Sequence, residues 1–467
     1  MDYSREELLK LSQEELIDDV ILPLLAAFDQ LKEQFTELEA MVTKPKKDSN
    51  NSSKPPSTDF FKGAKPVKNR GGGKQGHEPH YRKLCEKPDK RVFIPLKTCP
   101  HCGLDHKFNS KSYLTHQVIE LKSLDFEVIE YLRQKSTCCL SGKSVLSANP
   151  PGVFDHDLFG PRLKSLILIL YYENYLSVQK ICRFLSTFSP IKVSKGAVLT
   201  VLRKSGKAFE GTHAEIMSQI RNHDVVGIDE SGWRVSGKTE WLWAFQTKDQ
   251  VLYKIEKSRG SDVVKSVLGE EYNGTVISDF YSAYSKVKSK GKQKCLAHLL
   301  RKLKYIFELT GWNPQGYASI LRELFQEAIH LKNAVPFNST DFIWQRDLLE
   351  RRLDNYISEP VDHKEEKTIQ KRLIKYRKEL LLFLYDEQVD PTNNKSEQAI
   401  RPRVIHRKIC FGSRSDLGKE TYATNSSIIE TIKKRGENLF EGLKEVLESK
   451  PGSKPLLNLG FTLHDTS

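Results

Sequence analysis

Two short apolar runs that each end in an aspartate constrain the fold of this chain most. Val225, Val226 and Ile228 precede Asp229, and a similar run precedes Asp279. Such runs predict buried β-strands, and the stretches around them alternate between strand-like and helix-like patterns. The order of three strands, helix, strand, helix, strand and helix predicts an α/β sheet of mixed direction. We therefore expect one sheet that presents both aspartates at the ends of neighbouring strands.

Three carboxylates could share one site, although they lie far apart in the sequence. Glu397 follows the turn sequence DPTNN, and we expect it in the first turn of a helix. Converging carboxylates repel one another unless a cation lies between them, and hard oxygen ligands select Mg²⁺ or Mn²⁺. Asp229, Asp279 and Glu397 are therefore candidate ligands of a metal pair that acts on a phosphodiester. The alternatives are that each aspartate caps a turn and that Glu397 pairs with Arg401.

A long segment with helical spacing separates the second aspartate from the glutamate. It carries Ile320, Leu321, Leu324 and Phe325 at intervals of one to four residues, followed by charged helical sequence. We expect a catalytic domain over 223–436 that contains a helical insertion at about 305–390, and a C-terminal tail over 437–467.

The stretch before the sheet has the character of a helical DNA-binding domain, expected over 153–215. Ser177 and Ser194 are suitable N-caps for two short helices, the second of which is rich in lysine and arginine. A helix-turn-helix reader of a DNA groove has this form. The alternative is a helical pair that serves packing alone.

The N-terminal 83 residues comprise an acidic segment followed by a basic one. Residues 1–42 are acidic and carry apolar side chains at intervals of four and three, which predicts an amphipathic helix or a coiled coil, although Pro23 interrupts the run. A helix packed on its own protein is the alternative. From Thr43 to Lys83 there are 11 Lys+Arg against 3 Asp+Glu. We expect a flexible basic arm over 43–88 that follows DNA phosphates, or an inert linker.

A cysteine pattern between the arm and the helices suggests a zinc-finger-like domain over 89–150. Cys99 and Cys102 form a CPHC turn that could hold one ion. Two further ligands would come from Cys138 and Cys139, because Ser141 occupies the natural second position of the other pair. The alternatives are a structural Zn²⁺ and a zinc-free remnant of the same fold.

The composition favours a polyanionic partner in a reducing compartment. The chain has 74 Lys+Arg against 60 Asp+Glu, a net charge of +14, which suits nucleic acid. Eight cysteines in 467 residues do not form a disulfide framework pattern. No apolar run approaches the ~20 residues of a membrane span. We expect a soluble, cytoplasmic protein.

The phrases around the acids resemble a known family. IDESGWRV, SDFYSAYSKV, CLAHLLRKL and NNKSEQAIRPRVIHRKICFGS are similar, in order and spacing, to motifs of the insertion sequence sixty-six family of bacterial DDE transposases. The resemblance extends over roughly residues 48 to 445 and includes NSSKPPSTD, CPHCG and GPRLKSLILILYYENYL. Two positions depart from the family pattern: Ser141 in the second cysteine pair, and Phe280 in place of the glycine often found after the second aspartate.

The resemblance implies a fold and a set of site residues. The fold would be multidomain α+β, with a ribonuclease H-like (retroviral-integrase-like) catalytic core plus N-terminal helical, zinc-finger-like and helix-turn-helix-like modules. Asp229, Asp279 and Glu397 would be the catalytic acids. Basic positions that match the family and would contact DNA phosphates are His298, Arg301, Arg401, Arg407 and Lys408.

The resemblance also implies an activity and partners. The protein would bind the terminal repeats of an insertion sequence, cleave at the element ends and join 3′-hydroxyls to target DNA with Mg²⁺ or Mn²⁺. A homodimer or higher oligomer on DNA is expected, with accessory proteins as further partners. Two alternatives remain: a catalytically silent protein that occupies element ends, and a structure-selective nuclease of the same fold.

Overall fold

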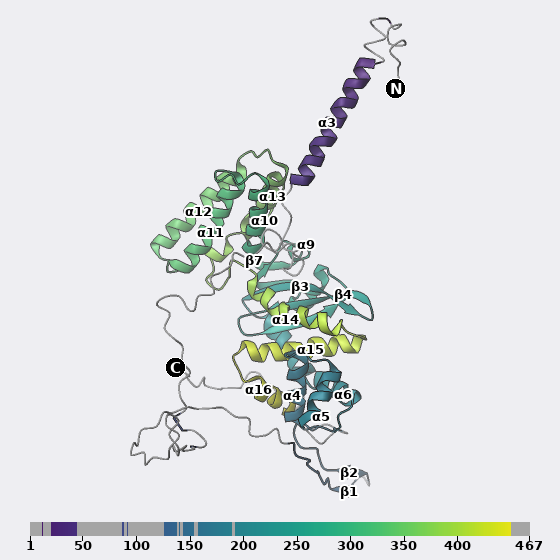
Figure 1. Ribbon diagram of the computed structural model, residues 1–467. Coiled ribbons are helices and arrows are strands. Elements are labelled where there is room, and N and C mark those ends of the chain that lie inside the picture. Colours follow the sequence, from purple (N-terminus) through teal and green to yellow (C-terminus); the bar gives the residue numbers. More distant parts are fainter. Residues whose placement is uncertain are drawn as a thin grey trace, which may run out of the picture.

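The structure is a computed structural model of the chain (Figure 1). The described residues are 20–43, 86–87, 126–137, 143–153, 157–188 and 192–449, together with Ser12, Arg91 and Leu140. In this part of the chain no helix is both long and apolar enough to cross a membrane.

Two of the predicted modules fall outside this description. The four candidate zinc ligands Cys99, Cys102, Cys138 and Cys139, and nearly all of the basic arm, lie among residues that the structure does not describe. The short antiparallel strands β1 (Lys135–Thr137) and β2 (Ser144–Leu146) flank the second cysteine pair in the sequence. The zinc prediction therefore stays a prediction.

A five-stranded sheet forms the centre of the molecule. Its strands are β3 (Val225–Val235), β4 (Lys238–Gln246), β5 (Val251–Glu256), β6 (Glu271–Ser278) and β7 (Lys288–Lys294). The spatial order is β5-β4-β3-β6-β7. The first three strands are antiparallel, and β6 and β7 run parallel to β3. The helices α8 (Ser261–Leu268) and α9 (Ser282–Ser285) precede and follow β6. The mixed sheet predicted from the sequence is confirmed.

One prediction about the first strand is wrong. Asp229 does not end β3: it pairs with Ala244 in the middle of a long hairpin. The hairpin turn is reduced to Ser236 and Gly237, whose φ angles of 48° and 81° are both positive, as a tight two-residue turn requires. The strand therefore continues through the sequence SGWRV, where Trp233 and Val235 are buried.

Two C-terminal helices cover the antiparallel half of the sheet. Helix α14 (Asn394–Cys410) packs on β3 and β4, and α15 (Asp416–Lys434) packs on β5. The hydroxyls of Thr431 and Ser427 accept hydrogen bonds from the backbone N–H groups of Val251 and Tyr253 at 3.1 and 2.8 Å. These bonds pair backbone N–H groups of the edge strand β5 that would otherwise be free to pair with another strand.

Helices from the sequence before the sheet pack beneath α15 (Figure 1). They are α4 (Pro161–Tyr172), α5 (Val178–Phe188), α6 (Lys195–Ala208) and α7 (Glu210–Arg221). Both predicted caps are confirmed: the hydroxyl of Ser177 accepts from Lys180 N at 3.3 Å and that of Ser194 from Ala197 N at 3.1 Å. The segment expected as a tail begins with a packed helix, α16 (Leu439–Glu448), which lies against α4.

A second group of helices lies at the opposite end of the sheet (Figure 1). It contains α10 (Leu296–Leu309), α11 (Tyr317–Ala334), α12 (Thr340–Ser358) and α13 (Lys364–Lys375), and it has its own apolar core. The buried Gln293 of β7 ties this group to the sheet, because its side chain donates to Leu380 O at 2.9 Å and accepts from Phe383 N at 3.0 Å.

Helix α3 (Leu22–Thr43) projects away from the other elements (Figure 1). It begins one residue before Pro23, so the proline lies in the first turn, where its missing N–H costs nothing, and does not interrupt the helix. Leu24, Phe28 and Leu31 are exposed along it. An exposed apolar surface of this kind is compatible with a coiled coil, which stays a prediction.

Candidate active site

The sheet brings Asp229 and Asp279 to equivalent positions on neighbouring strands. The last parallel pair of β3 and β6 joins Gly227 to Ile277. Two residues further along each strand, 227 + 2 and 277 + 2, are Asp229 and Asp279. Side chains at matching positions of neighbouring strands point to the same face. The two carboxylates therefore lie beside each other just beyond the end of the ladder.

The first turn of α14 is pinned to β3 next to Asp229. Asn393, immediately before the helix, donates its side-chain N–H to Ile228 O at 2.8 Å, and its backbone N–H to Cys295 Sγ at 3.1 Å. Gly227 permits the close approach, because a Cβ at that position would collide with the Ser396 hydroxyl. This docking places Glu397 at the edge of the sheet where the aspartates lie.

The three carboxylates influence one another electrostatically. Burial raises the pKa of Asp229 well above its ordinary value, and the negative charges of Glu230, Asp279 and Glu397 raise it further. We call Asp229, Asp279 and Glu397 the acid group. Asp279 and Glu397 therefore lie close enough to Asp229 to act on its charge, and Asp229 sits within a strand and not at its end.

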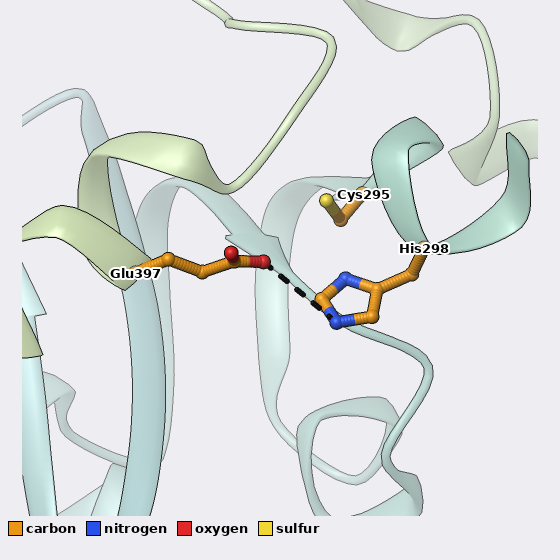
Figure 2. A group of neighbouring side chains, drawn as sticks. All are labelled: Cys295, His298 and Glu397. Atoms are coloured by element: carbon orange, nitrogen blue, oxygen red, sulfur yellow. Dashed lines mark ion pairs between the residues drawn. The ribbon is translucent and has the colours of Figure 1, made fainter. Parts of the chain in front are cut away.

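Two side chains of α10 face the glutamate. His298 Nε2 lies 3.7 Å from Glu397 Oε1 (Figure 2). Arg301 Nη2 lies 3.5 Å from the same oxygen. Burial and the charge of Arg301 lower the pKa of His298, although Glu397 and Asp279 oppose this shift. His298 is therefore mainly neutral near pH 7 and can donate or accept a hydrogen bond.

Cys295 completes a mixed group with His298 and Glu397. One potential ligand atom from each of the three residues lies within 4.8 Å of the others (Figure 2). Burial raises the pKa of the Cys295 thiol, in spite of the Asn393 N–H that donates to it. We interpret Cys295 as the contact that holds the Asn393 turn, and sequence inspection did not single it out.

The other predicted phosphate contacts lie along α14. Arg401 and Lys408 are exposed, and Arg401 lies one helical turn after Glu397. Arg407 is half-buried, and its Nη1 donates to Ser231 Oγ at 3.3 Å, so it also joins the helix to β3. Burial lowers the pKa of Arg407.

Phe280, which departs from the family pattern, packs away from the acids. Its ring meets the Tyr376 ring edge-on at 5.6 Å, and the Arg372 guanidinium lies 5.3 Å from its centroid. The backbone N–H of the next residue, Tyr281, donates to Asp279 Oδ1 at 2.8 Å. The phenylalanine therefore joins the sheet edge to the helical group and leaves the Asp279 carboxylate on the site.

Sequence inspection missed further residues of the site. Lys294 is buried and donates from Nζ to Asp279 O at 3.0 Å and to Ser278 Oγ at 3.3 Å. Glu230 and Arg259 form a salt bridge beside Asp229. Glu230 is adjacent to a predicted acid, which was a usable signal, whereas nothing in the local sequence marks Arg259 or Lys294.

The donor set of the acid group suits a hard divalent cation. Carboxylate oxygens are the ligands that Mg²⁺ and Mn²⁺ prefer, and a cation among them would offset the repulsion that raises the pKa of Asp229. Asp229, Asp279 and Glu397 could hold such an ion. The Cys295, His298 and Glu397 group offers a softer donor set, composed of a thiol, an imidazole and a carboxylate.

Comparison with known proteins decides the family. The profile described as "Transposase IS66 family" matches residues 156–421, more than half of the chain. The chain belongs to the transposase IS66 family. The resemblance seen in the sequence is thereby confirmed. A second profile, of a family of unknown function, matches residues 2–83.

Two relatives of this IS66-family chain come from Sinorhizobium fredii. The uncharacterized protein y4qI is 28% identical over 299 residues, which cover 55% of this chain and 53% of the relative. The uncharacterized protein y4jD is 23% identical over 430 residues, which cover 83% of this chain and 80% of the relative. The chain therefore spans about half the length of the first of these relatives.

Proposed function

We propose that the chain is a DDE transposase with a ribonuclease H-like catalytic core. The observation that carries the proposal is the convergence of the acid group on one edge of a mixed five-stranded sheet. Family membership supports DNA as the substrate, and the net charge of +14 agrees with a polyanionic partner. The reaction would be cleavage at the ends of an insertion sequence and joining of 3′-hydroxyls to target DNA.

In this proposal, the acid group would bind divalent cations and set their positions. When bound, a pair of cations supplies activation of a water or a 3′-hydroxyl and stabilisation of the leaving oxygen. Asp229 and Asp279 would contribute oxygens from the sheet, and Glu397 from α14. Asp229 is held within β3, Asp279 follows the end of β6, and the start of the helix that carries Glu397 is held by the Asn393 contacts.

Basic side chains next to the acids would hold the DNA backbone. Arg301 lies 3.5 Å from Glu397 and could neutralise a nearby phosphate, and neutral His298 could donate a hydrogen bond to a phosphate oxygen. Arg401 and Lys408 on the exposed side of α14 would extend the contact along the duplex. These contacts orient the scissile phosphodiester against the acid group.

The test is a cleavage and joining assay with the full-length protein. A labelled duplex would carry one end of the element that borders the gene, and a supercoiled plasmid would serve as target. We expect Mg²⁺-dependent exposure of a 3′-hydroxyl followed by joined products. Cleavage of branched DNA without joining would identify a nuclease instead. Neither cleavage nor joining with Mg²⁺ or Mn²⁺ would contradict an enzyme function.

A further inference from the structure

A salt bridge beside the acid group, between Arg259 and Glu230, is supported by aromatic rings next to the arginine. Arg259 lies in the loop between β5 and α8, and its Nε and Nη2 donate to Glu230 Oε1 at 3.0 and 2.7 Å. The guanidinium carbon lies 4.3 Å from the Trp241 ring centroid and 4.2 Å from that of Tyr281. Two cation–π contacts and two hydrogen bonds to one carboxylate oxygen restrict the orientation of this guanidinium.

Glu230 is occupied on both carboxylate oxygens. Arg259 donates to Oε1, and the Tyr284 hydroxyl donates to Oε2. The Glu230 side chain is only 3% exposed. Glu230 is therefore not a fourth member of the acid group, because a metal could use its oxygens only after both contacts had broken. Its role is to anchor the strand that carries Asp229.

The same arginine is also linked to Asp279, through Tyr281. Tyr281, on which the guanidinium stacks, donates its backbone N–H to Asp279 Oδ1 at 2.8 Å. Arg259 thus links the residue after Asp229 to the residue that orients Asp279. We call Glu230, Trp241, Arg259, Tyr281 and Tyr284 the arginine brace.

The brace lies where the backbone no longer holds the two strands together. The parallel pairing of β3 with β6 stops at Gly227 and Ile277, two residues before the aspartates. Beyond that point the separation of Asp229 and Asp279 depends on side-chain contacts. Beyond the ladder, the Arg259 contacts to Glu230 and Tyr281 connect the two strands, together with the hydrogen bond from the Tyr284 hydroxyl to Glu230.

We propose that Arg259 is a positioning residue that fixes the separation of Asp229 and Asp279 and thereby sets the affinity of the site for divalent cations. The inference rests on the proposed function in one respect, the acid group as the metal site. Outer contacts that orient metal ligands typically change metal affinity by about 10- to 100-fold when removed. Lysine would keep the charge of Arg259 but not its fork or its stacked plane.

The experiment measures Mn²⁺ binding to the full chain without DNA, from the electron paramagnetic resonance signal of free Mn²⁺. We expect Arg259→Lys to weaken Mn²⁺ binding about tenfold while the protein remains folded. The matched control is Arg377→Lys, because Arg377 also makes a forked contact, to Asp354, but lies in the helical group. The control should bind Mn²⁺ within about twofold of wild type.

A second variant protects the test against misfolding. Tyr284→Phe keeps the buried ring and removes only the hydroxyl that donates to Glu230, so it should fold and weaken Mn²⁺ binding by a smaller factor. Unchanged Mn²⁺ affinity in folded Arg259→Lys, or in Tyr284→Phe if the lysine variant fails to fold, would overturn the inference.

The outcomes also separate this inference from the proposed function. A wild-type protein that binds Mn²⁺ and loses affinity on Arg259→Lys, yet neither cleaves nor joins element ends, would overturn the proposed transposase reaction and support the brace. A wild-type protein that binds no Mn²⁺ would overturn both.

Discussion

Helix α14 carries two groups of charged side chains that are built in opposite ways. Glu397, in its first turn, belongs to the acid group, in which the nearest charges around Asp229 are other carboxylates. Arg403, six residues later (403 − 397), is fully buried against α4 and α15. The first group concentrates charge of one sign, and the second balances charge.

The balanced set consists of Arg403, Glu173 and Glu430, which we call the arginine group. Arg403 Nη2 lies 2.9 Å from Glu173 and 3.1 Å from Glu430, and Nη1 donates to Tyr172 O at 3.3 Å. Burial alone would lower the pKa of Arg403, but the surrounding hydroxyl and carboxyl groups outweigh it and the pKa lies above its ordinary value. The ion stays charged inside the protein because its partners are in place.

The difference teaches how a functional charge is distinguished from a structural one. Folding alone favours the arrangement of the arginine group, since every buried charge has a partner. In the acid group, Arg301 lies 3.5 Å from Glu397, but the charges that act most on Asp229 are carboxylates. The ionised form of Asp229 therefore costs stability unless a cation binds. Uncompensated like charge is expected where a ligand supplies the missing charge.

The largest expected effect is on catalysis. Glu397→Gln removes one acid ligand and should lower Mg²⁺-dependent cleavage by about 10³-fold or more, which corresponds to about 4 kcal/mol. Glu173→Gln in the arginine group is the control. It should lower stability but leave cleavage by the folded protein near the wild-type rate at 25 °C. Equal loss of cleavage in both variants would remove the distinction between the groups.

The free energy of unfolding should depend more on the arginine group than on the acid group. Arg403→Met leaves Glu173 and Glu430 without their buried partner and should lower the free energy of unfolding by about 3–5 kcal/mol. Chemical denaturation in EDTA at pH 7 measures this change. If the variant is as stable as the wild type, Arg403 does not compensate these carboxylates in the way described.

His406, on the same helix, adds a third arrangement, an ionisable group kept neutral. Burial and the charge of Arg403 lower its pKa to about 4, and its Nδ1 lies 3.0 Å from the Tyr422 hydroxyl. In the unfolded chain the imidazole binds a proton near pH 6.5. Between these values the unfolded state binds more protons, so the free energy of unfolding should fall as pH drops from about 6.5 to 4, by at most about 3 kcal/mol.

His406→Gln tests that pH dependence. The variant has no imidazole to protonate, so its stability should decline less than that of the wild type between pH 7 and pH 5. Denaturant unfolding at several pH values measures both slopes. Identical slopes would show that His406 is not the group that couples stability to pH in this range.

Much of the sheet and the helix that carries Glu397 could be predicted from the sequence. Short apolar runs before Asp229 and Asp279 indicate strands, and the DPTNN turn indicates the helix of Glu397. The strand that carries Asp229 was predicted too short, because its continuation depends on pairing with β4 and on the burial of Trp233. Local composition at a GW sequence favours a turn, and the tertiary environment overrides it.

The supporting contacts could not be predicted in the same way. Asn393 reaches Ile228 across 165 residues, and Arg259 reaches Glu230 across 29. Such contacts depend on the packing of distant elements, and a single asparagine or arginine in a loop sequence does not indicate its partner. The buried position of Arg403 is of the same kind, since its partner Glu173 lies 230 residues away.

The most direct test of the central claim is the thermal unfolding of wild type and Asp229→Asn, with EDTA and with Mn²⁺. An unfolded aspartate ionises near pH 3.8, and the folded Asp229 ionises only at higher pH. The folded state therefore binds more protons in that window, and the ionised carboxylate destabilises the metal-free protein at pH 7.

We predict that Asp229→Asn melts about 2–4 °C higher than the wild type in EDTA. Excess Mn²⁺ should raise the melting temperature of the wild type and leave that of the variant nearly unchanged. An Asp229→Asn protein that melts lower in EDTA and gains as much from Mn²⁺ as the wild type would contradict the claim that the acid group is an uncompensated metal site.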